Sequence, residues 1–324
     1  MGTRWATLLF VALSVVGGAL MVVQARMNAG LAVAEDSPWY AAAWSFGSGF
    51  LVVSVVVLLG ARVRHGVARF FREIAAGRLP WWTAIGGTIG ATFVLAQGLV
   101  APAVGIALFT VVGVAGQSLG AVTVDRLGFL GMPRRGLTWP RLVGAVLVVI
   151  AVTVATWSEL GGATAVWWLL LLPLANGLLR GVQQAINGRI REESGSAIAA
   201  TFVNFGGGSI VLVVAAGIGW AVTGQGPVAI DEWWLLFGGL LGIVHIAWQS
   251  FGVRWLGTLV LGLAMIAGQL VTSVVLDLVL PLPGTAVDGW QVAGVALAFI
   301  AVLVAALPVR GYAGVKRSES EFMQ

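Results

Sequence analysis

Cysteine is absent from this sequence of 324 residues, and histidine occurs only twice, as His65 and His245. Without cysteine the chain forms no disulfide and offers no thiolate to a metal or a substrate. Two histidines are too few for a zinc site built from imidazoles. The sequence therefore predicts that the protein holds no metal and no cofactor.

Charged residues are scarce as well. The 13 acidic and 18 basic side chains make up 10% of the chain, whereas a soluble domain carries about 25%. Hydrophobic residues make up 59%. This balance excludes a soluble enzyme and predicts an integral membrane protein in contact with the lipid bilayer.

The apolar runs predict ten transmembrane helices. Each run is close to the length of about 20 residues that crosses a bilayer, and none shows the period-2 alternation of a transmembrane strand. The predicted fold class is therefore all-α and integral to the membrane. The predicted spans are residues 5–24, 41–60, 81–100, 103–123, 141–157, 165–184, 198–221, 233–250, 256–276 and 291–307.

Basic and acidic side chains gather at opposite ends of the predicted spans. The positive-inside rule places the basic segments, and with them both termini, in the cytoplasm, and we expect the bacterial cytoplasmic (inner) membrane. No solvated basic domain is present, so no nucleic-acid partner is predicted. The basic segments contain Arg62, Arg64, Arg69, Arg72, Arg78, Arg126, Arg134, Arg135, Arg189, Arg191, Arg254, Arg310, Lys316 and Arg317.

The basic segment from Arg62 to Leu79 has two interpretations. It can form an amphipathic helix that places Phe70, Phe71 and Ile74 on the lipid side and is attracted to anionic headgroups. Alternatively, it only fixes the topology of the chain, and we favour this second interpretation at the level of sequence.

The two halves of the chain match each other. Three motifs of the first half recur in the second. Gln24-x-x-x-Asn28 recurs as Gln183-x-x-x-Asn187, and Phe46-Gly-Ser-Gly49 recurs as Phe205-Gly-Gly-Gly208. The third motif, Trp81-Trp82-x-x-x-Gly86-Gly87-x-x-Gly90, recurs as Trp233-Trp234-x-x-x-Gly238-Gly239-x-x-Gly242. The same register pairs Gln97 with Gln249, Gly116-Gln117 with Gly268-Gln269, Asp125 with Asp277 and Gly144 with Gly294. Apolar composition alone would not bring these rare polar residues into register.

The duplication predicts two five-helix repeats, residues 1–158 and 159–310, followed by a short cytoplasmic tail, 311–324. Because five crossings is an odd number, the second repeat must lie inverted relative to the first. Inverted repeats are typical of secondary transporters, in which two related halves expose one site to each side of the membrane in turn.

These motifs also carry a resemblance to a known family. The Gln-x-x-x-Asn pair, the Trp-Trp-x-x-x-Gly-Gly element and the Gly-Gln pair resemble the drug/metabolite transporter (DMT) superfamily, specifically its YdcZ-type branch in a fused, two-copy form. The resemblance covers nearly the whole chain. It implies a DMT-type permease fold of ten helices and small organic substrates, commonly moved outward. One departure is that the related small multidrug exporters use a glutamate in helix 1, and residues 5–24 contain none.

Strongly polar residues inside the membrane are candidates for function because they are costly there. Gln117 and Gln269 are equivalent in the repeat and lie near the middle of their helices, so they are the predicted central pair for substrate binding. The alternative is that each amide only bonds a neighbouring helix, a contact that contributes about 0.6 kcal/mol on average.

One stripe of the sixth span carries four polar side chains. Asn176, Arg180, Gln183 and Asn187 follow each other at i, i+4, i+7 and i+11 and share one helix face. Arg180 and Asn176 are predicted to bind substrate, with the guanidinium suited to a carboxylate or phosphate. Alternatively, the span ends early and Arg180 only reaches the interface. Gln183 and Asn187, and their equivalents Gln24 and Asn28, are predicted to line two gates or, alternatively, to bond local backbone.

The remaining titratable groups suggest little proton chemistry. His245 is a candidate proton relay, although its equivalent is Phe93 and a packed neutral imidazole fits equally well. Asp125 and Asp277 sit at span ends, where we expect them to face water or pair locally. Because no span carries a carboxylate at its middle, exchange of a cation for protons has no obvious carrier.

Together these features predict a secondary transporter for a small polar solute, neutral or anionic, that works by alternating access and exports its substrate. A flippase of lipid-linked substrates is the alternative. A membrane-integral enzyme is less favoured, because no HExxH motif is present, and so is a purely structural protein. Both repeats lie in one chain, so a monomer or a homodimer would suffice.

Overall fold

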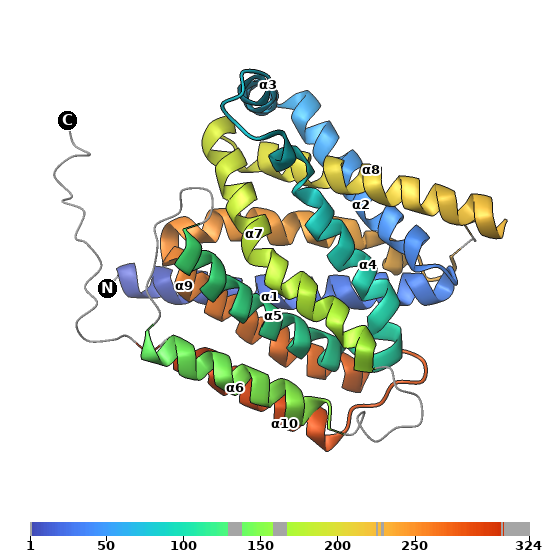
Figure 1. Ribbon diagram of the computed structural model, residues 1–324, viewed down its shortest axis with the longest axis vertical. Coiled ribbons are helices and arrows are strands. Elements are labelled where there is room, and N and C mark those ends of the chain that lie inside the picture. The colour runs from blue at the N-terminus through green and yellow to red at the C-terminus, as the bar shows by residue number, and fades with distance from the viewer. Residues whose placement is uncertain are drawn as a thin grey trace.

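The computed structural model describes residues 2–128, 138–157, 167–224, 226–227, 230–305 and 307 (Figure 1). All regular elements in these ranges are helical. They are α1 (Gly2–Ala34), α2 (Pro38–Leu59), α3 (Ala61–Ala75), α4 (Gly87–Val104), α5 (Ile106–Leu127), α6 (Trp139–Ala155), α7 (Leu171–Ser194), α8 (Ala197–Thr223), α9 (Gly238–Val279) and α10 (Gly289–Ala305). Short 3-10 turns, η1 (Trp81–Ile85), η4 (Trp167–Leu170) and η5 (Trp233–Phe237), precede α4, α7 and α9.

The helices confirm the predicted class, an all-α membrane protein. Among the described residues, 6 helical segments are long and apolar enough to cross a bilayer, and shorter apolar helices cover 142–155, 233–249 and 289–305. The apolar run predicted at 165–184 falls on η4 and α7, which continues beyond it to Ser194. The predicted tail, 311–324, lies outside the described residues.

Local sequence sets several of the helix ends. Ser37 caps α2 by accepting a hydrogen bond from the amide of Tyr40 (3.4 Å), and Pro38 follows at the first helical position. Ser196 caps α8 in the same way, through the amide of Ala199 (3.3 Å). Serine and proline are favoured at these positions because serine satisfies a free amide and proline lacks one. Between α4 and α5 the chain turns at Gly105, whose φ of 84° suits glycine.

Helix α9 replaces two predicted spans, 233–250 and 256–276, with one continuous but bent helix. A Cβ on Gly17 of α1 would lie 2.7 Å from Trp248, and one on Gly18 would meet the carbonyl of Met265. In a straight helix, Trp248 and Met265 would be about 25 Å apart at 1.5 Å per residue. The helix therefore folds back between them, and both of its arms pack against α1 (Figure 1). No proline interrupts residues 251–255 to force a separate loop there.

The basic segment after α2 forms the amphipathic helix α3, so the favoured interpretation, that it only fixes topology, was incomplete. The other interpretation, an amphipathic helix, is confirmed for the helix but is wrong in placing Phe70 on the lipid side. Phe70 is fully buried and packs with Ile186 and Ile190 of α7 and Val203 of α8, whereas Phe71 is exposed. Burial against protein anchors the helix where the isolated sequence suggested only a lipid contact.

The end of α3 carries an ion pair outside the membrane spans. Arg78 donates to both carboxylate oxygens of Glu73, the second at 2.9 Å. This hydrogen bond lowers the pKa of the Glu73 carboxyl and raises that of the Arg78 guanidinium. The Arg78 side chain is 65% exposed and that of Glu73 is 17% exposed, so solvent screens the pair and its contribution to stability is small.

Glycines in equivalent positions of the two halves make matching close contacts. At each, another segment occupies the space of a Cβ. A Cβ on Gly87 would meet the carbonyl of Asn204, and one on its equivalent Gly239 would meet the carbonyl of Ser45. Gly49 lies against the ring of Phe205, and its equivalent Gly208 lies against the ring of Phe46. Two further equivalent pairs lie against backbone carbonyls: Gly116 against Leu174 and Gly268 against Val15, and Gly18 against Met265 and Gly177 against Gly113. Thus α1 packs against the second arm of α9, and its equivalent α7 packs against α5. In the same way, α2 packs against the first arm of α9, and its equivalent α8 packs against α4.

Equivalent helices also run antiparallel where they touch. The rings of Phe46 and Phe205 lie 5.0 Å apart and those of Phe50 and Phe202 lie 5.2 Å apart, so α2 and α8 cross with opposite directions. In α6 and α10, Gly144 lies against Ala305 and Gly294 lies against Ala155. The pair α6 and α10 is therefore antiparallel as well (Figure 1).

Asp277 is buried, so the expectation that it faces water is wrong. Its carboxylate accepts hydrogen bonds from the amides of Ile106 (3.0 Å) and Ala107 (2.6 Å) at the start of α5. The last turn of α9 thus caps the N-terminus of α5 with a carboxylate, a favourable arrangement at that end of a helix. The side chain of its equivalent, Asp125, lies outside the described part of the structure.

Candidate functional site

A cleft of about 560 Å³ opens among the helices at one end of the bundle. Its walls come from the C-terminal halves of α5, α7 and α10, the N-terminal halves of α6 and α8, and the residues of α9 on either side of its bend. It extends along α7 to Arg191 and reaches Ala197 at the start of α8. The turn between these two helices packs against α3, where Ser194 occupies the space of a Cβ on Gly66. The cleft therefore reaches the end of the bundle where the basic helix α3 packs.

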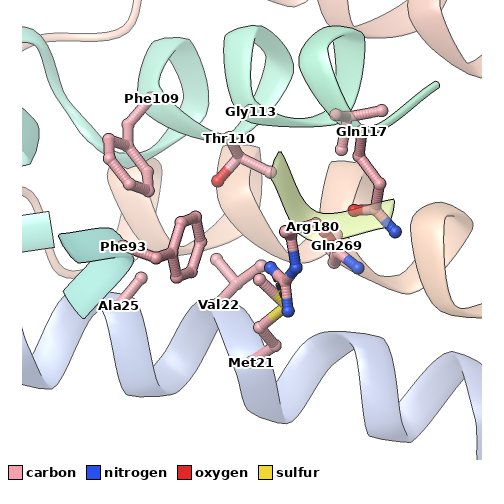
Figure 2. A pocket seen from close by; sticks show the side chains of 11 residues that line it. Met21, Val22, Ala25, Phe93, Phe109, Thr110, Gly113, Gln117, Arg180 and Gln269 are labelled. Carbon is pink, nitrogen blue, oxygen red and sulfur yellow. Dashed lines mark hydrogen bonds between the residues drawn. The ribbon is translucent and has the colours of Figure 1, made fainter. Parts of the chain in front are cut away.

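The inner end of the cleft narrows to a void of about 20 Å³, room for little more than one water molecule. Figure 2 shows this space, which Met21 and Val22 of α1, Phe93 of α4 and Phe109 of α5 line with apolar atoms. Beyond it, the largest apolar cluster of the protein fills the opposite end of the bundle. Access from the cleft therefore stops at this constriction.

Gln117, Arg180 and Gln269 line both the cleft and the narrow void, so they stand where one passes into the other. They come from three helices, α5, α7 and α9, and Figure 2 shows Arg180 extending toward Met21 with the two glutamines beside it. The structure thus brings together three of the four residues predicted to bind substrate. Gln117 and Gln269 occupy equivalent positions of the two repeats.

Arg180 lies among side chains of α1, α4, α5 and α9 at the inner end of the cleft. It is the tenth residue of α7, which begins at Leu171. Its Nη1 lies 3.4 Å from Met21 Sδ, and its guanidinium carbon lies 4.6 Å from the ring centre of Phe93. No described carboxylate pairs with it. A guanidinium held by an aromatic face and a thioether retains donors for an anion.

Asn176 does not line the cleft, although it shares a helix face with Arg180. Its side chain is buried, accepts a hydrogen bond from Thr92 Oγ1 (2.7 Å) and donates one to the carbonyl of Leu172 (3.0 Å). It links α7 to α4. Helical periodicity of 100° per residue shows that residues share a helix face. It does not show which part of that face lines a cavity and which part contacts a neighbouring helix.

The four residues predicted as gates have different surroundings. Gln24 and Asn28 are buried at the closed end of the bundle, whereas Asn187 lines the open cleft. Asn28 is buried and donates to Gln97 Oε1 over 2.7 Å, and Gln97 is fully buried. Gln24, also buried, lies against Gly242. Gln97 was missed as a partner, although its register with Gln249 in the repeat was a signal that could have found it.

Of the three equivalent side chains, two line the cleft and Gln183 does not. Asn187 and Gln249 both line it, and Asn187 Oδ1 accepts a hydrogen bond from Asn204 Nδ2 (3.1 Å). Gln183 lies against Gly90, as Gln24 lies against Gly242. No hydrogen bond joins Asn187 to Gln249 in the described structure. The Asn28–Gln97 contact therefore has no counterpart at the open end.

His245 lies in the first arm of α9 and is 4% exposed. Its Nδ1 lies 3.1 Å from the carbonyl oxygen of Gly17, and the residue lines the cleft that also contains Arg180. The Nε2 atom is buried and has no hydrogen-bond partner among the described residues. The structure does not test a proton relay here, which stays a prediction.

Comparison with known proteins places this arrangement in a family. A family model described as "Putative inner membrane exporter, YdcZ" matches residues 9–154 and 168–304. The chain belongs to the DMT_YdcZ family. The resemblance seen in the sequence is thus confirmed, and the protein is a multi-pass protein of the inner membrane. A search of curated proteins gives no match.

The two matched segments follow the helices of this YdcZ protein. The first begins in α1 and ends in α6, and the second begins in η4 and ends in α10. This division is consistent with a two-copy member of the family. Membership in an exporter family implies that the protein is not an enzyme, and it leaves the substrate unidentified.

Proposed function

We propose that this YdcZ-family protein is a secondary transporter that exports a small polar organic solute, anionic or neutral, by alternating access. The observation that carries the proposal is the cleft of about 560 Å³ that ends at Gln117, Arg180 and Gln269. Its size is within the range of about 300–1,000 Å³ typical of small-molecule sites. A cleft open at one end and closed by packing at the other is the geometry expected of one state of such a transporter.

The proposal includes an inverted repeat of residues 1–158 and 159–310, ten transmembrane helices in all. Two findings support it. The equivalent glycines make matching contacts across the two halves, and the equivalent helices α6 and α10 run antiparallel. A local twofold axis perpendicular to these helices accounts for both findings, and for membrane-spanning helices such an axis lies in the membrane plane and inverts one half. Because both halves lie in one chain, the site needs no second subunit.

The topology follows from the charges of the cleft end. With Arg191 and the basic helix α3 placed in the cytoplasm, the cleft opens inward and the Asn28–Gln97 pair lies toward the outside. The substrate then enters from the cytoplasm and meets Arg180. Among the described residues, the lining contains arginines but no aspartate or glutamate. The site therefore favours an anion over a cation.

Replacing Gln117 and Gln269 by alanine tests the central site. We expect each variant to lose about five- to tenfold in substrate affinity, because a hydrogen bond to a substrate in a closed site contributes about 1 kcal/mol or more. Affinity is measured by the concentration dependence of thermal stabilisation and of flux in proteoliposomes, with a solute found in a metabolite screen. Gln291→Ala is the matched control, because Gln291 is buried in α10 away from the cleft. Normal transport by both variants would show that the central assignment is wrong.

Breaking the Asn28–Gln97 hydrogen bond is expected to favour the outward-open state. One hydrogen bond contributes about 1 kcal/mol net, so its loss changes the equilibrium constant between the inward-open and outward-open states roughly fivefold. The chain has no cysteine, so a single Ala25→Cys, placed in the narrow void, reports access without a background. In whole cells, Asn28→Ala should raise the labelling rate of that cysteine by an impermeant maleimide roughly fivefold.

Asn187→Ala is the control with the opposite sign. If the Asn187 and Gln249 side chains pair in the outward-open state, as their equivalents do here, their loss disfavours that state and slows labelling. Equal shifts in one direction for Asn28→Ala and Asn187→Ala would contradict a reciprocal pair of gates. Both variants keep Gln117, Arg180 and Gln269, so substrate affinity measured on purified protein serves as an internal check.

A further inference from the structure

The unpartnered nitrogen of His245 lies in the same cleft as Arg180. The imidazole is 4% exposed, its Nε2 is buried without a partner, and both residues line the cleft. A buried polar atom left without a hydrogen bond is costly and calls for an explanation. His245 lines the cleft, so a ligand that enters there can supply the missing partner once a small shift of the surrounding side chains uncovers Nε2.

The contact of the other ring nitrogen determines what kind of partner Nε2 needs. A backbone carbonyl only accepts, so Nδ1, 3.1 Å from the oxygen of Gly17, carries the hydrogen and donates it. In a neutral imidazole the remaining nitrogen is then an acceptor. The neutral form is favoured because the imidazole is buried and because Arg180, which lines the same cleft, would repel a second positive charge. His245 Nε2 therefore requires a hydrogen-bond donor.

The charge of the cleft selects among donors. An ammonium group would lie near Arg180 and meet the same repulsion, with no described carboxylate in the lining to offset it. A hydroxyl donates a hydrogen bond without carrying charge. The guanidinium of Arg180, held by Phe93 and Met21, presents further donors that suit a carboxylate.

We propose that the cleft binds a hydroxycarboxylate, whose carboxylate pairs with Arg180 and whose hydroxyl donates to His245 Nε2. This inference rests on the proposed function and names its substrate class. Arg180 sets the charge of the substrate, and His245 distinguishes a hydroxy acid from the same acid without its hydroxyl. A site built to bond a hydroxyl rejects the analogue that lacks it, because its own polar atom is then left unpaired.

The test compares two acids that differ in one group. Purified protein in detergent is titrated with 2-hydroxyisocaproate and with isocaproate, and affinity is read by calorimetry and thermal stabilisation. The wild-type protein is expected to bind the hydroxy acid about tenfold more tightly, the effect of one satisfied buried acceptor. In His245→Phe, the residue found at the equivalent position 93, the two acids should bind equally. His245→Gln serves as a second variant if the first does not fold, and His65→Phe on the exposed face of α3 is the control.

The outcomes separate this inference from the proposed function. Discrimination that is lost in the His245 variants but kept in His65→Phe supports the hydroxycarboxylate assignment. If the wild-type protein binds both acids equally and Arg180→Gln abolishes both, the role of His245 is overturned and the anion transporter stands. If neither acid binds at millimolar concentration, the assignment is overturned, and flux of another solute that depends on Gln117 would still uphold the transporter.

Discussion

Replacing Arg180 by glutamine is expected to weaken binding of an anionic substrate by roughly 100-fold, which corresponds to about 2.7 kcal/mol. The guanidinium stands at the junction of the cleft and the narrow void and has no described carboxylate partner, so a bound anion is its natural counter-charge. Its removal leaves that anion without a charged donor in a poorly solvated site. Affinity is measured by titration of the purified variant, and transport by uptake into inverted vesicles.

Arg180→Lys and a neutral solute provide the controls. Lysine keeps the charge but loses the planar pair of donors that matches a carboxylate, so the anion should lose about tenfold while a neutral solute changes little. Equal losses for both solutes in Arg180→Lys would remove the counter-charge role. Arg62→Gln, on the exposed face of α3, removes one basic residue outside the cleft and should leave affinity unchanged.

Alanine at Gly87 or Gly239 is expected to lower the free energy of unfolding by about 3 kcal/mol or to prevent folding, the upper range for overpacking a core. A Cβ at Gly87 would overlap the carbonyl oxygen of Asn204, and one at Gly239 would overlap that of Ser45. Both obstacles are backbone atoms of α8 and α2, which cannot rotate away as a side chain can. Each substitution must therefore push apart the helices that cross there.

Gly217→Ala is the matched control for these variants. Gly217 lies in the exposed face of α8, and no atom stands within 4 Å of an added Cβ. Alanine there should be neutral or stabilise α8 by about 0.5 kcal/mol, because glycine is the poorer helix former. The measurement is thermal unfolding in detergent followed by size-exclusion chromatography. Wild-type stability of Gly87→Ala would show that the close helix crossing is absent in solution.

Much of the site could be predicted from the pairing of rare polar residues in the two halves. The repeat predicts Gln117 and Gln269 as the central binding pair because they are equivalent and lie near the middle of their helices. Both line the cleft. Arg180 lines it as well. Asn176 does not line the cleft, because one face of α7 contacts both the cleft and a neighbouring helix. The hydrogen bond from Thr92 places the Asn176 side chain against that neighbouring helix, α4.

The Asn28–Gln97 contact shows what a repeat alone cannot supply. Both residues belong to the duplicated pattern, but their equivalents, Asn187 and Gln249, do not bond in the same structure. Identical patterns thus have two arrangements, and the sequence carries no information about which one is adopted at each end. In the proposed alternating-access cycle, this difference depends on the conformational state of the whole bundle.

The sequence by itself determined the membrane class, most of the helix positions, the duplication and the family, because each depends on composition, hydrophobic length or register along the chain. Tertiary structure alone decided the fold-back of α9, the burial of Phe70, the capping of α5 by Asp277 and the unpartnered nitrogen of His245. Each of these depends on segments far apart in sequence that packing brings together. Hydrophobic periodicity shows that a face is apolar, but only the neighbouring helix determines whether that face meets lipid, protein or a cavity.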